Sequence, residues 1–377
     1  MKIKDYKSGI WVQKYKYKSF SPTVINHAWE VDDEKLNYQL SLTNIKLGEL
    51  NAFSMLIPDV DYFIRMHIKK EATASSRIEG TQTTMEDALQ KVENVNPEKR
   101  NDWHEVNNYV DAMNHSIGQL INLPLSNRLL RNAHDIILRG VRGENKSRGE
   151  FRRSQNWIGG ASLNDAIFIP PHQDEVADLM SDLEKFLHND DLFIPDLIRI
   201  GIAHYQFETI HPFLDGNGRI GRLLITLYLV NRGVLVKPTL YLSDFFDRNK
   251  FLYYDNLMRV RTDNQMGQWL LYFLEGVHQT AENSIIIFRK IIALRNEIEQ
   301  QRLTKLGKKT RSAQTLLIYL FSNPIVDSTD IARALSVNMT TAMRMINDFI
   351  ELGILKETTG YKRNRVFIFE EYVALFA

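Results

Sequence analysis

Apolar residues recur every three or four positions over most of the chain, and this spacing predicts a mainly α-helical protein. Helices are predicted over residues 103–120, 126–138, 174–186 and 195–209. The run 223–230 is apolar nearly all round, as in a helix that is buried on every side. The middle of the chain is therefore expected to form a helical core.

The first hundred residues have a less regular pattern. Residues 1–50 mix short β-like runs with polar turns, and a helical pattern then covers residues 52–80. Thr84 and Asp87 have the spacing of a capping box, so another helix is predicted to begin directly after Thr84. The polar stretch 93–102 predicts a loop before the helical core.

A β-hairpin is predicted between two of the core helices. Residues 156–171 contain two short apolar runs on either side of Leu163, Asn164 and Asp165. Short apolar runs around a polar turn are typical of a hairpin.

The end of the chain predicts a separate winged-helix module. Helical patterns cover 310–322, 328–335 and 338–352, and two β-rich runs follow at 354–357 and 365–369. Three helices followed by a hairpin make a winged helix, a fold that binds DNA in many proteins and pairs proteins in others.

Charges on this module leave both roles open. The third helix carries Arg344 but also Asp348 and Glu351, whose negative charges would be repelled by DNA phosphates. The wing has a basic edge made by Lys356, Lys362, Arg363 and Arg365. DNA contact is one reading, and protein pairing is the other.

Composition limits the number of domains and the classes of partner, site and location to be expected. The 377 residues suggest two or three domains, and the 47 basic and 46 acidic side chains nearly cancel. This balance argues against a general polyanion binder, although a local basic patch stays open. Since the chain has no cysteine, disulfides, thiol catalysis and thiolate metal sites are excluded. The chain has neither a signal-like start nor an apolar stretch of about 18 residues, so we expect no membrane contact and a cytoplasmic location.

One segment of the core, H-P-F-L-D-G-N-G-R-I-G-R from His211 to Arg222, concentrates the chemistry. Gly216 and Gly218 flank Asn217, and glycines allow backbone N–H groups to converge on an anion. A helix starting there would point its free N–H groups at the same place. The segment therefore predicts a phosphate site.

The other polar residues of this segment suit the handling of a nucleotide. His211 can take a proton near neutral pH, and Asp215 offers oxygen ligands that suit Mg²⁺. Arg219 and Arg222 are three residues apart, so on a helix they project from one side and can bind phosphate oxygens. None of these groups is a good covalent nucleophile. The predicted reaction is direct attack of an acceptor hydroxyl on a nucleotide phosphate.

The segment resembles the signature H-x-F-x-[D/E]-G-N-G-R-x-x-R of the Fic family at every fixed position. The resemblance implies an all-helical core that transfers AMP from ATP, with Mg²⁺, to a Ser, Thr or Tyr hydroxyl of a target protein. It implies that His211 is the general base and Asp215 the metal ligand. The nucleotide-binding residues that it implies in the motif are Phe213, Gly216, Asn217, Gly218, Arg219 and Arg222.

A second resemblance lies upstream and concerns regulation. Residues 74–81, A-S-S-R-I-E-G-T, resemble the inhibitory motif [S/T]-x-x-x-E-[G/N] of Fic proteins. Ser75 and Glu79 would share a helix face, and Gly80 is placed to end that helix. The resemblance implies that Glu79 pairs with Arg222 and denies ATP a productive position.

Two further expectations follow from the resemblance. The predicted hairpin stands where the family has a flap that pairs with the target peptide by strand addition. Tyr253 and Tyr254 lie where family members place residues around the adenine, so they are expected to contact it. The implied division is an N-terminal region 1–100, a Fic core 101–300 and a winged helix 301–377, with a homodimer as a further expectation.

Alternatives remain at this stage. The same scaffold could move another group or remove AMP, or the chain could be a DNA-binding regulator whose core senses a nucleotide. A transition-metal site is a weaker alternative, because His204, Glu208 and His211 are spaced for one helix face. Pro212 disfavours helical geometry at His211, which speaks against that site.

Overall fold

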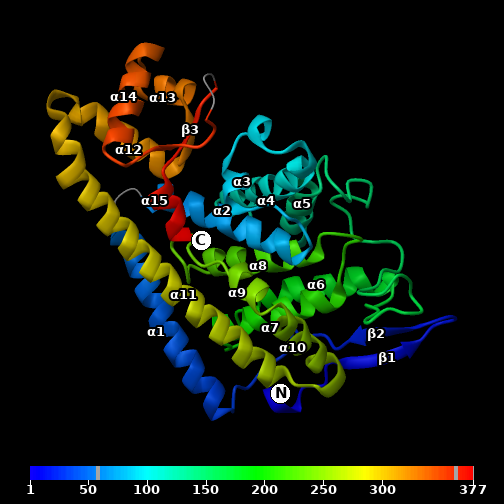
Figure 1. Cartoon of the computed structure of the whole chain (residues 1–377). Coiled ribbons are helices and arrows are strands. Elements are labelled where there is room, and N and C mark those ends of the chain that lie inside the picture. Colours follow the sequence, from blue (N-terminus) through cyan, green and yellow to red (C-terminus); the bar gives the residue numbers. More distant parts are fainter. Residues whose placement is uncertain (57–59, 361–363, 377) are drawn as a thin grey trace.

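The computed structural model describes residues 1–56, 60–360 and 364–376. It is mainly helical, as predicted, and its elements surround a layer of buried helices (Figure 1). No helix in the described part of the chain is both long and apolar enough to cross a membrane.

The core helices lie close to the predicted ranges. They are α4 (Arg100–Gln119), α5 (Asn127–Ile137), α6 (Val176–His188), α7 (Asp196–Ile210) and α8 (Asn217–Asn231). In α7 every residue from Leu197 to Ile210 is buried, and α8 is buried from Leu223 to Leu229. Because both helices are covered on all sides, the loop that joins them is held firmly.

Three helices complete the layer around α7 and α8. They are α9 (Ser243–Arg248), α10 (Lys250–Asp263) and the long α11 (Met266–Glu297). Two short helical turns, Ile298–Arg302 and Leu303–Lys309, follow α11.

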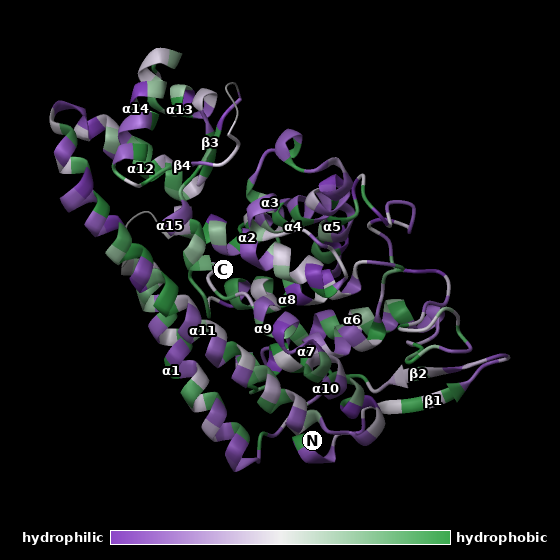
Figure 2. Ribbon diagram, viewed as in Figure 1, coloured by the Kyte–Doolittle hydropathy of each residue, from purple (hydrophilic) through white to green (hydrophobic). Residues whose placement is uncertain are grey.

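The expectation for the N-terminal region is wrong in one respect. Helix α1 runs from Glu34 to Leu56 and packs along α11, although residues up to 50 were expected to be irregular. Its buried face is spaced at helical intervals and consists of Leu36, Leu40, Leu47 and Leu50. Figure 2 shows hydrophobic and hydrophilic residues alternating around both helices. The stripe is sparse because polar residues separate its members, and the pattern was therefore misread.

The remaining N-terminal elements agree better with the sequence. Strands β1 (Gly9–Gln13) and β2 (Lys18–Pro22) form an antiparallel hairpin, and α2 covers Val60–Ile78. The capping box is confirmed, because Thr84 and Asp87 each accept the other's backbone N–H at the start of α3 (Met85–Leu89). The expected loop before α4 contains two 3₁₀ turns, Val92–Asn94 and Pro97–Lys99.

The predicted hairpin at 156–171 is present only in reduced form. Ile158 and Phe168 form one isolated antiparallel bridge, and this stretch of the described chain has no longer ladder. Gly159 and Gly160 both have positive φ, which bends the chain directly after the bridge. We call residues 156–171 the flap.

The C-terminal elements follow the predicted order. Helices α12 (Thr310–Ser322), α13 (Ser328–Leu335) and α14 (Met339–Glu351) match the expected ranges within a residue. Strands β4 (Lys356–Glu357) and β5 (Val366–Ile368) pair as expected, and a third strand, β3 (Ile325–Asp327), joins the far side of β5. The sequence missed β3, which is short and lies between two helices. The chain ends with α15 (Glu370–Val373) and a turn at Ala374–Phe376.

Helix α2 connects this C-terminal part to the core. The Phe63 ring lies 5.3 Å from the Phe321 ring and 6.5 Å from the Tyr372 ring. One turn later, the His67 ring lies 5.1 Å from the Phe376 ring. The first half of α2 is thus anchored by aromatic contacts, while its other end reaches the start of α8.

Candidate active site

His211 leaves helix α7 through a left-handed turn. Helix α7 ends at Ile210, and His211 has φ 50° and ψ 60° as its C-cap. Pro212 follows, and the residue before a proline avoids the right-handed helical region. The turn brings His211 to a cavity of about 680 Å³ that Glu79 and Arg222 also line.

Side chains at the base of the flap hold the His211 backbone. Its carbonyl oxygen accepts hydrogen bonds from Arg152 Nε at 3.0 Å and from Asn156 Nδ2 at 3.1 Å. Arg152 also donates to the carbonyl of Pro171, at the other end of the flap. Sequence reasoning assigned no role to Arg152 or Asn156, although Gly149 to Arg152 resembles a family segment, G-x-[FY]-R.

The imidazole of His211 is neutral at physiological pH. Burial, with the charges of Arg152 and Arg261 in support, lowers the pKa of His211 to about 3. Its Nδ1 atom is buried and has no hydrogen-bond partner. A neutral imidazole keeps a lone pair on one of its two nitrogens, and this is the form that accepts a proton.

The loop before α8 is closed by Asn217. The Phe213 N–H donates to Asn217 Oδ1, and Asn217 Nδ2 donates back to the Phe213 carbonyl, both at 2.8 Å. Gly216 has φ 72°, which suits a residue without a Cβ, and it caps α8. Asn217 thus supports the loop with its side chain, and only backbone N–H groups can face an anion there.

Phe213 does not line the cavity. Its ring is fully buried and stacks on His134, with 3.9 Å between ring centroids and 9° between planes. The expectation that Phe213 contacts the nucleotide is therefore not supported by its position, and it instead fixes the loop from the core.

His134 is a supporting residue that sequence reasoning missed. Its Nδ1 accepts the Gly149 N–H at 2.9 Å, so its Nε2 carries the proton and donates to the Asp215 carbonyl at 3.0 Å. Burial lowers the pKa of His134 to about 4, which keeps this tautomer neutral. No spacing in the sequence links position 134 to 215.

Asp215 presents its carboxylate at the edge of the loop. Oδ1 accepts the Gly216 N–H at 2.6 Å and lies 3.6 Å from a guanidinium nitrogen of Arg219. The side chain is 37% exposed, which leaves room for a cation beside it. Arg219 itself is buried and bonds Glu105 at 3.2 Å, so it points toward α4 and Asp215.

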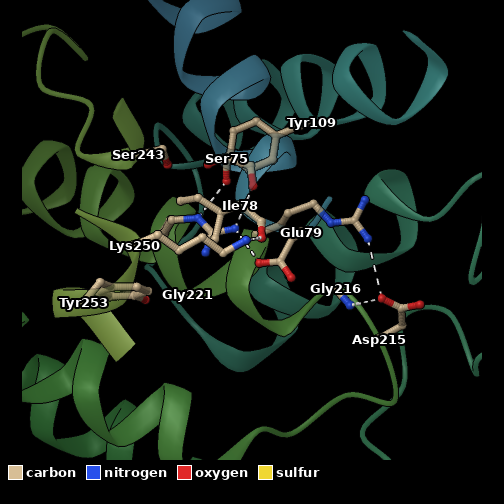
Figure 3. A network of polar contacts seen from close by, with 12 residues as sticks. Ser75, Ile78, Glu79, Tyr109, Asp215, Gly216, Gly221, Ser243, Lys250 and Tyr253 are labelled. Carbon is tan, nitrogen blue, oxygen red and sulfur yellow. Dashed lines mark hydrogen bonds and ion pairs between the residues drawn. The ribbon is translucent and has the colours of Figure 1, made fainter. Parts of the chain in front are cut away.

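Arg222 is bound by the end of helix α2. Its Nε donates to Ser75 Oγ, and one terminal nitrogen donates to the Ser75 carbonyl, both at 2.9 Å. The same nitrogen lies 2.7 Å from Glu79 Oε1, so the structure contains the ion pair that the resemblance implies (Figure 3). Gly80 has φ 102° and follows the end of the helix, as expected of a glycine that stops it.

The electrostatics of this pair follow from its surroundings. Burial would raise the pKa of Glu79, but the charge and hydrogen bond of Arg222 outweigh it and lower that pKa. Burial would likewise lower the pKa of Arg222, but the charge of Glu79 raises it. Both groups are therefore charged near neutral pH.

The Glu79 carboxylate also covers the backbone at the start of α8. A Cβ added at Gly218 would lie 2.3 Å from Glu79 Oε1 and 2.9 Å from Arg222 Nη1. Only glycine leaves room for the carboxylate there. An anion thus already occupies the N-terminal turn of α8, where helix N–H groups favour negative charge.

The two tyrosines line the cavity in different ways. Tyr254 is 43% exposed, while Tyr253 is buried and its ring stacks on Phe246. His204 donates from Nδ1 to the Gly221 carbonyl, so its Nε2 accepts the Tyr253 hydroxyl at 2.9 Å. Both nitrogens of His204 therefore have hydrogen-bond partners.

The transition-metal alternative is wrong, because the described residues contain no group of three side chains that could hold a metal.

Glu208 lies beneath this site without a partner for one of its oxygens. Its Oε1 is buried and unbonded, and burial raises the pKa of Glu208 to about 7. A Cβ added at Gly221 would lie 2.1 Å from that oxygen. Gly221 therefore makes room for the Glu208 carboxyl group.

The sequence of the chain is similar to family models and to known proteins. The chain matches the Fic/DOC family N-terminal model over residues 38–118 and the Fic/DOC family model over 124–229. It is 32% identical over 135 residues to the protein adenylyltransferase Fic of Culex quinquefasciatus, a stretch that covers 36% of this chain and 24% of that protein. The relative in Drosophila erecta, of the same name, is 38% identical over 86 residues, or 22% of this chain and 16% of that protein. The matches thus span a quarter or less of these relatives.

Two solved structures share the fold. A Fic family protein from Desulfovibrio desulfuricans has a TM-score of 0.57 at 19% identity, over 91% of this chain and 98% of that one. A Fic domain containing signalling protein from Bacteroides thetaiotaomicron has a TM-score of 0.52 at 19% identity, over 68% of this chain and 96% of that one.

The packing of Gly221 against Glu208 predicts opposite effects for two glycine substitutions. Gly221→Ala should lower the free energy of unfolding by about 1–3 kcal/mol, because the new methyl group meets a buried carboxyl oxygen. Gly118→Ala, on the exposed face of α4, meets nothing within 4 Å and should raise it by about 0.4–1 kcal/mol. Urea unfolding measures both values. Equal stability of the two variants would contradict the placement of Glu208.

Proposed function

Because the chain belongs to the Fic/DOC family, we propose that it is a protein adenylyltransferase. It transfers AMP from ATP to a Ser, Thr or Tyr hydroxyl of a target protein, and Glu79 holds it inactive. The observation that carries the proposal is the Glu79 carboxylate, paired with Arg222 at the start of α8 and beside His211.

The inhibition follows from competition for one position. The Glu79 carboxylate lies 2.7 Å from Arg222 and against the backbone of Gly218. The γ-phosphate of ATP would bind the same cation and the same helix terminus. Two anions cannot share that space, so ATP binds productively only when Glu79 withdraws.

His211 serves as the general base in the transfer. The acceptor oxygen forms a bond to the α-phosphorus, and the bond from that phosphorus to the bridging oxygen of the β-phosphate breaks. Pyrophosphate leaves, and the hydroxyl proton passes to the neutral imidazole of His211. Arg152 and Asn156 hold the carbonyl of His211, which fixes the direction of its ring.

Asp215 is the residue that would hold Mg²⁺. Its carboxylate is part exposed at the edge of the loop, and its Oδ1 is oriented by the Gly216 N–H. One carboxylate suffices for a metal that takes its other ligands from phosphates and water. The ion neutralises phosphate charge when it is bound. The Arg219 guanidinium lies 3.6 Å from the Asp215 carboxylate and would help to position it. That Arg219 also binds phosphate stays a prediction.

The cavity also has places for the adenine and the target. Tyr254 offers an exposed aromatic face to the base, and the buried Tyr253 supports it from behind. The flap has only the single bridge at Ile158 and Phe168 and no longer ladder in the described chain, so it is proposed to pair with an extended peptide of the target.

The alternative of a DNA-binding regulator has less support from the wing. Lys362 and Arg363 lie outside the described residues. Lys356 bonds Glu370 at 2.8 Å, and Arg365 lies 3.7 Å from Glu357, so both charges are partly neutralised. DNA binding, a homodimer, a cytoplasmic location, the three-part domain division and transfer of another group remain predictions.

Replacement of Glu79 tests the proposal directly. Close charge pairs couple by about 1.5–7 kcal/mol, so Glu79→Gly should raise label transfer from α-labelled ATP to protein by at least about tenfold. γ-Labelled ATP should leave no label on protein, because pyrophosphate carries it away. Glu79→Asp should give an intermediate gain, since its carboxylate reaches Arg222 less well.

Two double variants serve as controls. Glu79→Gly with His211→Ala should lose about 10²–10⁴ in rate while the protein still folds. Glu79→Gly with Arg222→Ala should be inactive, because the arginine is needed once the glutamate has gone. Wild-type transfer by Glu79→Gly, with ATP and Mg²⁺ in excess, would refute the inhibitory role.

The pKa of Glu79 predicts how inhibition depends on pH. Because the folded-state pKa is lowered from 4.5, the ion pair is fully present above about 4.5 and is lost only as pH falls through the lower folded value. The ratio of Glu79→Gly to wild-type rates should therefore stay constant from pH 8 to 5. A ratio that falls toward one between pH 7 and 5.5 would mean that burial outweighs Arg222.

A further inference from the structure

The β1–β2 hairpin lies against the flap and extends its surface. It projects from the body of the molecule on the side where the flap lies (Figure 1). The Phe20 N–H donates to the Ile169 carbonyl at 2.9 Å, and the Tyr17 hydroxyl donates to Gln155 Oε1 at 3.2 Å. Strand β2 therefore bonds the flap on one side and β1 on the other.

One aromatic side chain separates this hairpin from the cavity. The Trp11 ring lies 6.0 Å from the ring of Phe168, and Phe168 lines the cavity together with His211. The Arg261 guanidinium lies over the same ring at 4.0 Å and holds it in place. Trp11 therefore connects the surface of the hairpin to the lining of the cavity.

The hairpin and the flap share exposed apolar side chains. Ile10 and Trp11 on β1 are 68% and 44% exposed, and Trp157 and Ile167 on the flap are 40% and 70% exposed. Figure 2 shows β1 as hydrophobic and the turn beyond it as hydrophilic. Exposed tryptophan beside aliphatic residues is typical of protein-binding surfaces.

The turn of the hairpin carries unpaired positive charge. Residues 6–29 contain lysines but no acidic residue, although the chain as a whole is balanced. None of Lys14, Lys16 and Lys18 has an ion-pair partner in the described chain, whereas Lys4 pairs with Asp32 at 3.1 Å. Tyr15 stands among them with 95% of its surface exposed.

We propose that the β1–β2 hairpin is a docking arm for the target protein, and that it selects an acidic segment next to the modified hydroxyl. Trp11 continues the apolar surface of the flap, and the three lysines attract acidic side chains. In the described chain β1 pairs only with β2, so its outer edge, on the side of the hairpin away from the flap, is open to a further part of an extended segment. The inference rests on the proposed adenylyltransferase function.

A nucleic acid would use the lysines but not the rest of the surface. Phosphate contacts need cations and hydrogen-bond donors, and Ile10 and Ile167 offer neither. The exposed Trp11, which contacts the flap residue Phe168, together with the lysines favours an acidic protein segment.

The test uses the full chain with Glu79→Gly and a fluorescent random copolymer of glutamate and tyrosine as the probe. The copolymer should bind more tightly than a copolymer with alanine in place of glutamate. Because each exposed charge pair contributes little and three are lost, Lys14→Glu with Lys16→Glu and Lys18→Glu should weaken binding by at least about threefold. KM for transfer of labelled AMP to the copolymer should rise by the same factor, with kcat nearly unchanged.

A matched control replaces three exposed lysines far from the flap by glutamate and so reverses their charge; they are Lys290, Lys305 and Lys308. It changes the net charge equally and should leave binding and KM as they are. The hairpin variant should still label itself with AMP. This result separates the two proposals, because a chain without any self-labelling refutes the transferase function.

Copolymer binding that changes no more in the hairpin variant than in the control, or that shows no preference for acidic copolymer, would overturn the docking arm. Loss of duplex DNA binding with unchanged copolymer binding would also overturn it and identify a nucleic-acid surface.

Discussion

Arg222 is a buried cation, and the structure around the site depends on how its charge is balanced. Its side chain is 1% exposed, and an unpaired charge at such a depth costs several kcal/mol. Ser75 and Glu79, at the end of α2, accept hydrogen bonds from Arg222, and Glu79 also neutralises its charge. These contacts hold the end of α2 against α8. Any ligand that displaces Glu79 must itself be an anion at the same place, and this requirement makes a phosphate the natural competitor.

The two partners of this ion pair are not equally free to move. The Glu79 side chain is 32% exposed and lies just beyond the end of α2 at Ile78, whereas Arg222 is enclosed. The other end of α2 is fixed by the rings around Phe63. Displacement of Glu79 therefore requires a change in its own side chain and in the turn at Gly80, and the helix can remain in place. The loop that carries the proposed catalytic groups is meanwhile held by His134, Arg152 and Asn156, so the proposed inhibition and the proposed catalysis depend on separate supports.

The sequence predicts local features well and distant contacts poorly. The turn at His211 follows from Pro212, the helix stop follows from Gly80, and the ion pair follows from a family resemblance. The burial of Phe213 and the role of His134 depend on contacts between α5 and the motif, which no spacing encodes. Helix α1 and strand β3 were missed because their apolar positions make sense only beside α11 and β5. Glu208 and Gly221 belong to the same class, since each is explained by the other.

We propose that Glu79 occupies the place of the γ-phosphate on Arg222. Calorimetric titration of the wild type and of Glu79→Gly with ATP and with ADP, each with Mg²⁺, tests it most directly, with the His211→Ala change added to both to prevent turnover. Loss of Glu79 should tighten ATP binding by about tenfold or more, whereas the affinity for ADP, which lacks a γ-phosphate, should gain much less. An equal gain for the two nucleotides, or no gain for either, would contradict it.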